Sequence, residues 1–441
     1  MIRIYKKLML LLDKKQKRAM VGLVFMMLIG AILEAAGISA VIPVIQIVLD
    51  ENALEKYAYV RAIYEGLHMK SQMQFTVLVL VALAVVFAVK NIYLYIQQKV
   101  MCHFVYTNQF RTSERMMKNY LRKGYEFYLN ADTAVVQRNI TSDVNNMYAL
   151  ILAILQLISE VIVFVILAVV LLVADWKMTL MISAMLILTL LVITKVVKPV
   201  LRKAGKDNQD YYSGLFKWIS QTVQGIKEVK VAGKEQYFVD EYIACGQGYV
   251  DAVQKYTLLN NVPKLLIESV SIIGVVIYMI FLLLTGTSVM DMMPILTVFA
   301  AAVVRLMPCA TRINNQLNNI IYFEPFLMGV SDNLQEEING ENVDMSFAKE
   351  SDAKLPLKKE IRLEGISYAY PNTDKLIFDN ANMTIPIGKA VGIVGTSGAG
   401  KTTVVDILLG LLKLKTGVIY ADDKDIMSDY RAWLKNIGYI P

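Results

Sequence analysis

Residues 151–173 read ILAILQLISEVIVFVILAVVLLV, and Glu160 is the only charged side chain among them. A helix needs roughly 20 consecutive apolar residues to cross the hydrocarbon core of a bilayer. This stretch meets that requirement with a single polar interruption. It therefore predicts a membrane-spanning helix, and with it an α-helical membrane protein.

Apolar runs of similar length recur along the chain. They predict six spans, at about 19–48, 74–97, 147–173, 178–199, 263–285 and 289–313. The first run follows a basic N-terminus, as the core of a signal peptide does. That core is only roughly 7–15 residues long, however, and the run from Ala19 to Leu49 is about twice as long. We therefore expect an uncleaved first span.

Lysine and arginine are distributed unevenly between these runs. Segments 98–146 and 200–262 are long and basic, whereas the loops around Asp175 and Asp291 are short and nearly uncharged. Basic segments stay on the cytoplasmic side of a membrane. We therefore expect both termini in the cytoplasm and the protein in an inner or plasma membrane. The two long segments lack clusters of Gly and Pro, so they are expected to continue the spans as helices.

Composition excludes several other classes of protein. Of 441 residues, 56% are hydrophobic and 19% are charged, below the roughly 25% charged residues of a soluble domain. The net charge of +7 is assigned to membrane topology, because no sequence-specific nucleic-acid motif accompanies it. No nucleic-acid partner is therefore expected. The three cysteines lie far apart and are interpreted as free thiols: Cys102, Cys245 and Cys309.

The pattern changes after the last apolar run. Residues 334–360 are polar and charged, which predicts a linker. Short strands and turns follow, with strands expected at Ala390–Val394, Gly417–Tyr420 and Ile437–Ile440 and a helix at 401–413. The chain is therefore divided into a membrane domain at 1–333, the linker, and the first part of an α/β domain at 361–441.

Residues 395–402 read Gly-Thr-Ser-Gly-Ala-Gly-Lys-Thr, which fits the phosphate-loop pattern G-x-x-x-x-G-K-[ST]. Glycines let the backbone turn tightly and aim N–H groups at phosphate oxygens, and the following helix adds its positive end. Lys401 is expected to reach the β- and γ-phosphates, and the Thr402 hydroxyl to bind Mg²⁺. ATP and Mg²⁺ are therefore the predicted ligands of Gly395, Thr396, Ser397, Gly398, Ala399, Gly400, Lys401, Thr402 and Thr403.

With six spans, two long inner segments, a linker and a phosphate loop, the whole chain resembles the exporter-type ATP-binding cassette transporters. The resemblance implies an ATP-hydrolysing translocase that works as a dimer, with a second copy as the expected partner. Within Tyr368-Ala-Tyr-Pro371, it implies that Tyr370 stacks on adenine; an edge-strand aromatic is the alternative. Tyr125–Asn130 and Gly225–Gly233 resemble the coupling regions, although ordinary solvated helix explains them nearly as well.

The catalytic residues implied by the resemblance cannot be assigned. Beyond Pro441 the family continues with a glutamine, a signature loop, an acidic strand with the catalytic glutamate, and a switch histidine. We therefore expect a fragment or a truncated gene product. An inactive product that inserts without transporting is one alternative function. A membrane-anchored kinase is another, disfavoured because no kinase-specific constellation is present.

Charged side chains also occur within or at the ends of apolar runs. The basic ones are Lys90, Lys264, Arg305 and Arg312, and the acidic ones are Glu34, Glu160 and Glu268. A charge at the bilayer centre costs at least about 2.5–3.5 kcal/mol, so such groups pair with each other or face a cavity. Both interpretations stay open here. Internal ion pairs are one, and the other is that the four basic residues bind an anionic head group.

Two segments carry a narrower similarity that bears on the substrate. Glu34–Pro43 and Arg305–Arg312 are similar to the lipid-linked oligosaccharide flippases. This similarity implies a polyprenyl-pyrophosphate-linked oligosaccharide as the transported molecule, with membrane lipids around it. Other lipid, peptide or drug exporters share parts of the pattern and remain alternatives.

Overall fold

The computed structural model describes residues 2–49, 64, 66, 71–174, 176–284, 289–339 and 353–440. The chain forms two compact units. The first comprises Met1–Thr112 and Thr141–Ser331, and the second comprises Ser113–Ile140 and Asp332–Pro441. A segment of the predicted membrane domain, Ser113–Ile140, is thus grouped with the predicted nucleotide-binding residues.

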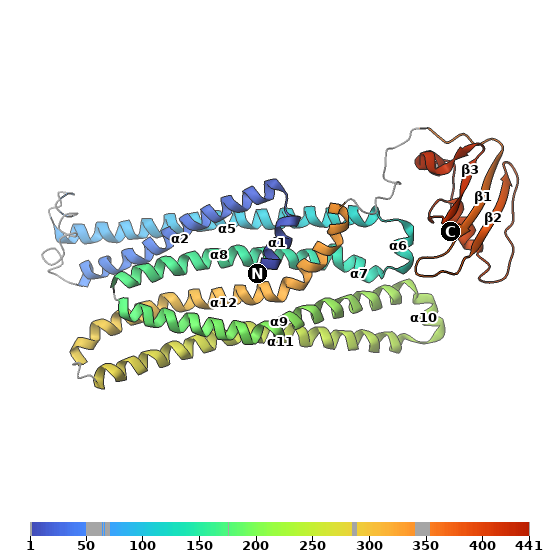
Figure 1. Cartoon of the computed structure of the whole chain (residues 1–441). Helices are drawn as coiled ribbons and strands as arrows, with labels where there is room; N and C mark the ends of the chain where they lie inside the picture. The colour runs from blue at the N-terminus through green and yellow to red at the C-terminus, as the bar shows by residue number, and fades with distance from the viewer. Residues whose placement is uncertain are drawn as a thin grey trace. The chain divides into compact units, whose positions relative to one another are not determined.

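Long helices make up the first unit (Figure 1). They are α1 (Ile2–Leu11), α2 (Lys14–Leu49), α8 (Val144–Ala174), α9 (Trp176–Gln224), α10 (Ile226–Ala232) and α11 (Glu235–Leu284), with most of α5 (Gln72–Leu121) and α12 (Val289–Asn339). Each predicted span coincides with one of these helices over most or all of its length. The two long inner segments are largely helical, as expected, and α9 packs along α11.

Within the described part of the chain, three stretches are long and apolar enough to cross a membrane: Lys14–Glu34, Met73–Leu121 and Thr133–Val169. A fourth results if Ser183–Ile193 and Lys195–Gln224, bent by 40°, form one span. Pro199 accounts for the bend, because a proline ring clashes with the carbonyl four residues earlier. The number of six spans stays a prediction.

A four-stranded antiparallel sheet, ordered β2-β1-β3-β4, forms part of the second unit. Its strands are β1 (Glu360–Tyr368), β2 (Phe378–Pro386), β3 (Thr416–Ala421) and β4 (Lys424–Asp425). Leu363, Ile366 and Tyr368 of β1 are buried. Leu363 and Ile366 are three residues apart, so in a regular strand their side chains would lie on opposite faces. A register shift at Gly365, whose φ is +60°, brings both side chains into the core.

Two short helices pack through buried aromatic side chains: α13 (Lys401–Leu408) and α14 (Tyr430–Leu434). The Trp433 indole N–H donates to the Leu408 carbonyl at 3.1 Å, and the Tyr430 hydroxyl donates to the Leu409 carbonyl at 3.0 Å. Carbonyls at the C-terminal end of a helix have no partner within it. These bonds therefore satisfy the end of α13 and hold it against the core.

Two of the predicted strands are absent from the structure. Neither Ala390–Val394 nor Ile437–Ile440 has strand structure, whereas the prediction at Gly417–Tyr420 is confirmed by β3. The reason is pairing: neither segment hydrogen-bonds to the sheet, and a strand requires a neighbour for its backbone groups. Val394 is 96% exposed as a result.

Two boundaries also differ from the prediction. The helix expected at 401–413 ends at Leu408, because Gly410, with φ of +72°, takes a left-handed conformation that ends helices. Helix α12 continues to Asn339 and so occupies the start of the predicted linker at 334–360. Val330 and Leu334 are fully buried one turn apart, which extends the packed face of the helix.

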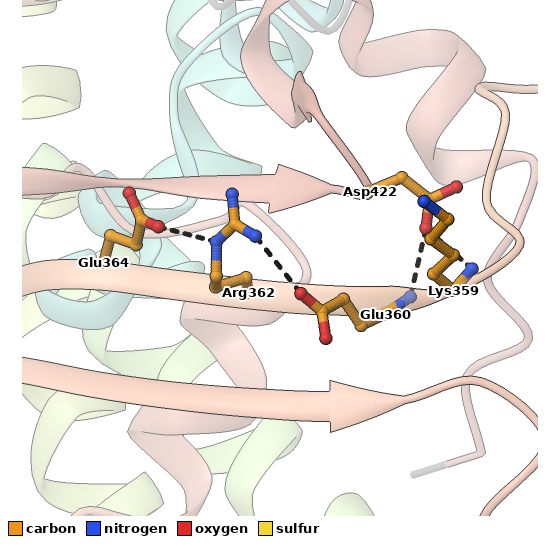
Figure 2. A network of polar contacts seen from close by, with 5 residues as sticks. All are labelled: Lys359, Glu360, Arg362, Glu364 and Asp422. Atoms are coloured by element: carbon orange, nitrogen blue, oxygen red, sulfur yellow. Dashed lines mark hydrogen bonds and ion pairs between the residues drawn. The ribbon is translucent and has the colours of Figure 1, made fainter.

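Asp422 fastens the start of β1 to the end of β3 (Figure 2). Its carboxylate accepts hydrogen bonds from the backbone N–H groups of Lys358, Lys359 and Glu360 at 2.8, 2.8 and 3.0 Å. These bonds, that of Glu360 above all, stabilise the ionised carboxylate and lower its pKa. Asp422 itself has φ of +54°, which Asp tolerates better than most side chains.

Arg362 orders the solvent side of the same strand. Its guanidinium lies between Glu360 at 3.1 Å and Glu364 at 2.6 Å (Figure 2). It also lies 5.4 Å from the centre of the Tyr420 ring. Exposed ion pairs contribute little free energy. The ion pairs of Arg362 therefore fix the positions of side chains on β1, whereas Asp422 holds the backbone of the strand.

We expect Asp422→Asn to destabilise the second unit at neutral pH, because an amide cannot present two anionic oxygens to three N–H donors. The folded pKa of Asp422 is lowered, so its contribution is present above the unfolded value of about 3.9 and is lost as pH falls through the folded pKa. Urea unfolding followed by Trp433 fluorescence, with the other tryptophans replaced, measures this at pH 7 and in acid. Between pH 7 and acid, the free energy of unfolding should fall less in the variant than in the native protein. The exposed neighbour Asp423→Asn is the control, and equal effects of both substitutions would contradict the assignment.

Candidate nucleotide-binding site

The loop Gly395–Gly400 connects the segment after β2 to α13. Gly398 and Gly400 have φ of +81° and +86°, a region that other residues rarely adopt. A Cβ on Gly400 would lie 3.0 Å from both Ile377 Cγ2 and Phe378 Cζ, so this position also requires glycine for space. A Cβ on Gly398 would meet no atom within 4 Å, which leaves room on that side of the loop.

Lys401 begins α13, and its side chain folds back over the loop. Its Nζ donates to the carbonyl oxygens of Gly395 at 2.9 Å and Thr396 at 2.8 Å. The N–H of Ala399 donates to the same Thr396 carbonyl at 3.2 Å, which closes the turn. The ammonium is thus held against the loop, where phosphate oxygens could replace the carbonyls as its partners.

The first turn of α13 supplies further groups that suit a phosphate. N–H groups there have no acceptor within the helix, since the Val404 N–H makes the first such bond, to the Gly400 carbonyl at 2.9 Å. They carry the positive end of the helix dipole. The Thr402 side chain is exposed and that of Thr403 is buried, so of these two hydroxyls only Thr402 is accessible to a metal ion. The residues therefore fit a magnesium nucleotide.

Tyr370 lies beside this turn. Its hydroxyl is 2.8 Å from Thr403 Oγ1, and its ring meets the Tyr368 ring edge-on, with centroids 5.3 Å apart. The Ile377 N–H donates to the Tyr368 carbonyl at 2.8 Å and closes the loop that carries Tyr370. The structure thus brings Tyr370 and the phosphate loop together, although stacking on adenine stays a prediction. The bond to Thr403 is a contact that the sequence did not indicate.

Helix α6 (Tyr125–Asn130), the first predicted coupling region, belongs to the same unit. Glu126 Oε1 accepts the backbone N–H of Lys413 at 3.0 Å. An open cavity of about 370 Å³ is lined by Glu126, Phe127, Asn130, Ala131 and Pro371. Burial, and then the Asp406 carboxylate on α13, raise the pKa of the Tyr125 hydroxyl. This segment therefore contacts the residues that follow α13 and the loop of Tyr370.

The second predicted coupling region, Gly225–Gly233, forms helix α10 in the first unit. Gly233, with φ of +62°, ends the helix, and the Lys234 N–H closes the motif on the Val229 carbonyl at 3.1 Å. Val231 is 82% exposed at its tip. The coupling role of this segment stays a prediction.

Among the predicted substrate residues whose side chains are described, Arg312 is the one with an acidic partner. Its Nε lies 2.7 Å from Glu160 Oε1, so an ion pair joins α12 to α8. Its Nη2 also lies 3.4 Å from Cys309 Sγ. Of the two interpretations open at the sequence level, an internal ion pair is thus realised at Arg312. The side chain is still 45% exposed, which leaves part of the guanidinium accessible.

The other three basic residues lie on three different helices. Lys90 of α5 has its Nζ 4.6 Å from the centre of the Phe87 ring, and its Cδ would touch a Cβ placed on Gly37 of α2. Lys264 of α11 is exposed. Arg305 lies on α12, but its side chain is outside the described residues. The structure does not gather the four into one described site.

Comparison with known proteins finds a family profile that matches each of the two parts of the chain. The sequence profile of the ABC transporter transmembrane region matches residues 22–305, and that of the ABC transporter domain matches residues 378–441. The first match runs from the first predicted span into the last, and the second includes β2, the phosphate loop and α13.

Several curated proteins are similar in sequence. The ATP-dependent lipid A-core flippase of Pseudomonas fluorescens is 24% identical over 58% of this chain and 41% of its own length. An uncharacterised ABC transporter ATP-binding protein of Sinorhizobium fredii is 22% identical over 82% of this chain and 61% of its own. The mitochondrial iron-sulfur clusters transporter of Aspergillus fumigatus is 36% identical over 23% of this chain and 15% of its own. The chain therefore spans less than two thirds of each of these relatives.

The two matches follow one another in the order of an exporter half-transporter, with a helical membrane region ahead of the nucleotide-binding residues. The membrane-region profile alone covers more than half of the chain. On this evidence the chain belongs to the ABC transporter family, with the architecture of an exporter half-transporter.

Proposed function

We propose that this protein is one half of a dimeric transporter that uses ATP to export or flip a lipid-type substrate across the inner or plasma membrane. The observation that carries the proposal is the Lys401 ammonium, held at 2.8–2.9 Å over an open glycine loop, in a chain that also carries long apolar helices. A phosphate-binding turn and a membrane region in one polypeptide suit the conversion of nucleotide energy into movement of a molecule across lipid.

The nucleotide is held by three kinds of contact in this proposal. Lys401 and the free N–H groups of α13 would bind the β- and γ-phosphates, and the Thr402 hydroxyl would hold the Mg²⁺ ion. The Tyr370 ring, fixed through Thr403, stacks on adenine. The ion supplies charge neutralisation of the phosphates when it is bound.

Coupling is proposed to pass through α6. The bond between Glu126 and the Lys413 N–H links this helix to the chain that follows α13. Only residues 122–124 separate α6 from the end of α5, one of the apolar membrane helices. Movement of the nucleotide-binding residues would therefore reach the end of α5, whose first half is a predicted span.

The proposed substrate is a lipid with an anionic head group, such as a polyprenyl-pyrophosphate-linked oligosaccharide. Arg312, half-exposed and held by Glu160, and Lys264, exposed on α11, support this choice. Guanidinium groups suit pyrophosphate because they bind its oxygens through two parallel hydrogen bonds. A flippase for a lipid is among the similar proteins, although its identity of 24% leaves the particular lipid open.

Lys401→Ala should weaken ATP binding roughly tenfold to a hundredfold, the effect of losing charge-assisted hydrogen bonds. Binding of labelled ATP to the full-length transporter measures this directly. Lys389→Ala removes an exposed lysine from the same region and should bind ATP normally. Unchanged binding in Lys401→Ala would count against the whole proposal.

Tyr370 is tested by two substitutions that separate its ring from its hydroxyl. Tyr370→Ala removes the stacking face and should weaken ATP binding roughly fivefold to a hundredfold. Tyr370→Phe keeps the face and loses only the bond to Thr403, so its affinity should stay near that of the native protein. Measurement with ATP and with inorganic triphosphate distinguishes base from phosphate contacts, because only ATP should respond. Intact ATP affinity in Tyr370→Ala would refute the stacking role.

Arg305→Gln and Arg312→Gln should each lower lipid translocation in reconstituted vesicles by about tenfold or more, because each removes a charge-assisted contact to the head group. Glu160→Gln separates the two roles of Arg312. If Arg312 only pairs with Glu160, both substitutions impair transport alike; if it binds the head group, Glu160→Gln is the milder. Lys198→Gln, an exposed cation on α9, is the control. Native transport rates in both arginine variants would overturn the substrate assignment, with ATP binding unaffected.

A further inference from the structure

The first 18 residues of the chain are strongly basic. They contain one carboxylate, Asp13, and seven cations: Arg3, Lys6, Lys7, Lys14, Lys15, Lys17 and Arg18. The structure folds them into α1 and the first turn of α2, joined by a sharp corner. Neither the nucleotide site nor the proposed substrate residues involve this corner.

Helix α1 is docked and not free. Ile4, Leu8 and Leu11 are buried at 3%, 1% and 8% exposure, and their spacing of four and three residues puts them on one face. The remaining surface combines exposed Lys6 with apolar side chains, because Tyr5 is 60% exposed. Leu10, at 55% exposure, adds a second apolar group. This mixture is typical of a helix that lies in the head-group region of a membrane.

The corner between α1 and α2 is fixed by hydrogen bonds. Asp13 Oδ1 accepts the Gln16 N–H at 2.6 Å, and Gln16 Oε1 accepts the Asp13 N–H at 2.9 Å, a reciprocal cap of the helix start. Gln16 Nε2 also donates to Asn108 Oδ1 of α5 at 3.0 Å. The only carboxylate of the corner is thus engaged with backbone, and the corner is tied to a second helix.

Six of the seven cations of this corner have no acidic partner among the described residues. Throughout the described ranges, no ion pair involves Arg3, Lys6, Lys14, Lys15, Lys17 or Arg18. Lys14, Lys15 and Arg18 are also exposed. These three residues begin the stretch Lys14–Glu34, which is apolar and long enough to cross a membrane. These charges therefore lie at the start of the stretch that is expected to enter the membrane.

We propose that the corner of α1 and α2 binds anionic phospholipid head groups of the leaflet that α2 enters. Lipid phosphates lie within a Debye length of cations placed at this level, so each attraction is only partly screened. Tyr5 and Leu10 fit the same partner, because tyrosine and exposed aliphatic side chains favour the interface of a bilayer. The phosphate backbone of a nucleic acid offers no apolar layer beside its charges.

Topology alone is the competing explanation. Basic residues next to a first span direct its orientation during insertion, and they could face solvent afterwards. The two explanations differ in the folded protein. Only lipid binding predicts that the corner discriminates between anionic and zwitterionic head groups once insertion is complete.

A local probe tests this in the full chain. Tyr5→Trp places an indole at an exposed position of the corner, and brominated acyl chains quench an indole that they contact. The protein is reconstituted in phosphatidylcholine vesicles that contain either brominated phosphatidylglycerol or brominated phosphatidylcholine. The quenching of the new indole is obtained by subtracting the quenching of the protein that keeps Tyr5, measured in the same vesicles. Half-maximal quenching by phosphatidylglycerol should need an at least about fivefold lower mole fraction.

Two sets of substitutions decide whether the cations cause the preference. Lys14→Gln, Lys15→Gln and Arg18→Gln together should remove most of it. The matched set Lys217→Gln, Lys227→Gln and Lys234→Gln should retain it, because these exposed lysines lie roughly 25 Å or more along the helices from the predicted spans. Circular dichroism and gel filtration establish that each variant is folded. Equal quenching by the two lipids, or a preference that survives neutralisation of the corner, would overturn the proposal.

Discussion

A chain segment in lipid must satisfy its backbone hydrogen bonds within itself, and this constraint shapes the first unit. The apolar windows of α2, α5 and α8 are continuous helix. Interruptions gather in the segments predicted to be cytoplasmic, where water and side chains can cap a helix end. Asp132, for example, accepts the Ala134 N–H at 2.9 Å at the start of α7 (Thr133–Arg138). Pro199 and Pro263, likewise, stand at the cytoplasmic ends of their predicted spans.

The same constraint governs where polar side chains can be buried. Beyond the predicted spans, hydrogen bonds tie α5 to α12 and to the segment before α8: Tyr120 donates to Asn333 Oδ1 at 2.8 Å, and Asn139 donates to the Tyr120 hydroxyl at 2.7 Å. Lipid gives no help in bringing apolar helices together, since it is as apolar as they are. Such networks therefore hold the helices together outside the predicted spans. Within the predicted spans, Glu160 and Arg312 form an ion pair, because a charge in lipid needs a partner.

Local patterns predicted the parts of the fold that depend on local physics. A run such as 151–173 must be helical wherever it packs, and the tight turn expected of the glycine loop is formed with left-handed φ values at Gly398 and Gly400. Contacts between distant residues were not predictable in this way. Nothing in the residues around Arg312 selects Glu160 over Glu34 or Glu268, and nothing near Glu126 indicates the Lys413 amide. Ala390–Val394 failed as a strand for this reason: its apolar residues were recognised, but a strand also needs a partner along its edge.

Helix α13 connects the features that matter for the proposed function. Its first residue, Lys401, already makes two hydrogen bonds to the loop. A phosphate would therefore replace the carbonyl oxygens as partners of the ammonium, and the turn itself would keep its conformation. Its other end is held by Trp433 and Tyr430. Eight residues of helix are roughly 12 Å long and too short to bend appreciably. Under the proposed coupling, a shift that phosphate imposes at Lys401 moves α13 as a rigid rod, and the residues after Leu408 carry the displacement to Lys413 and Glu126.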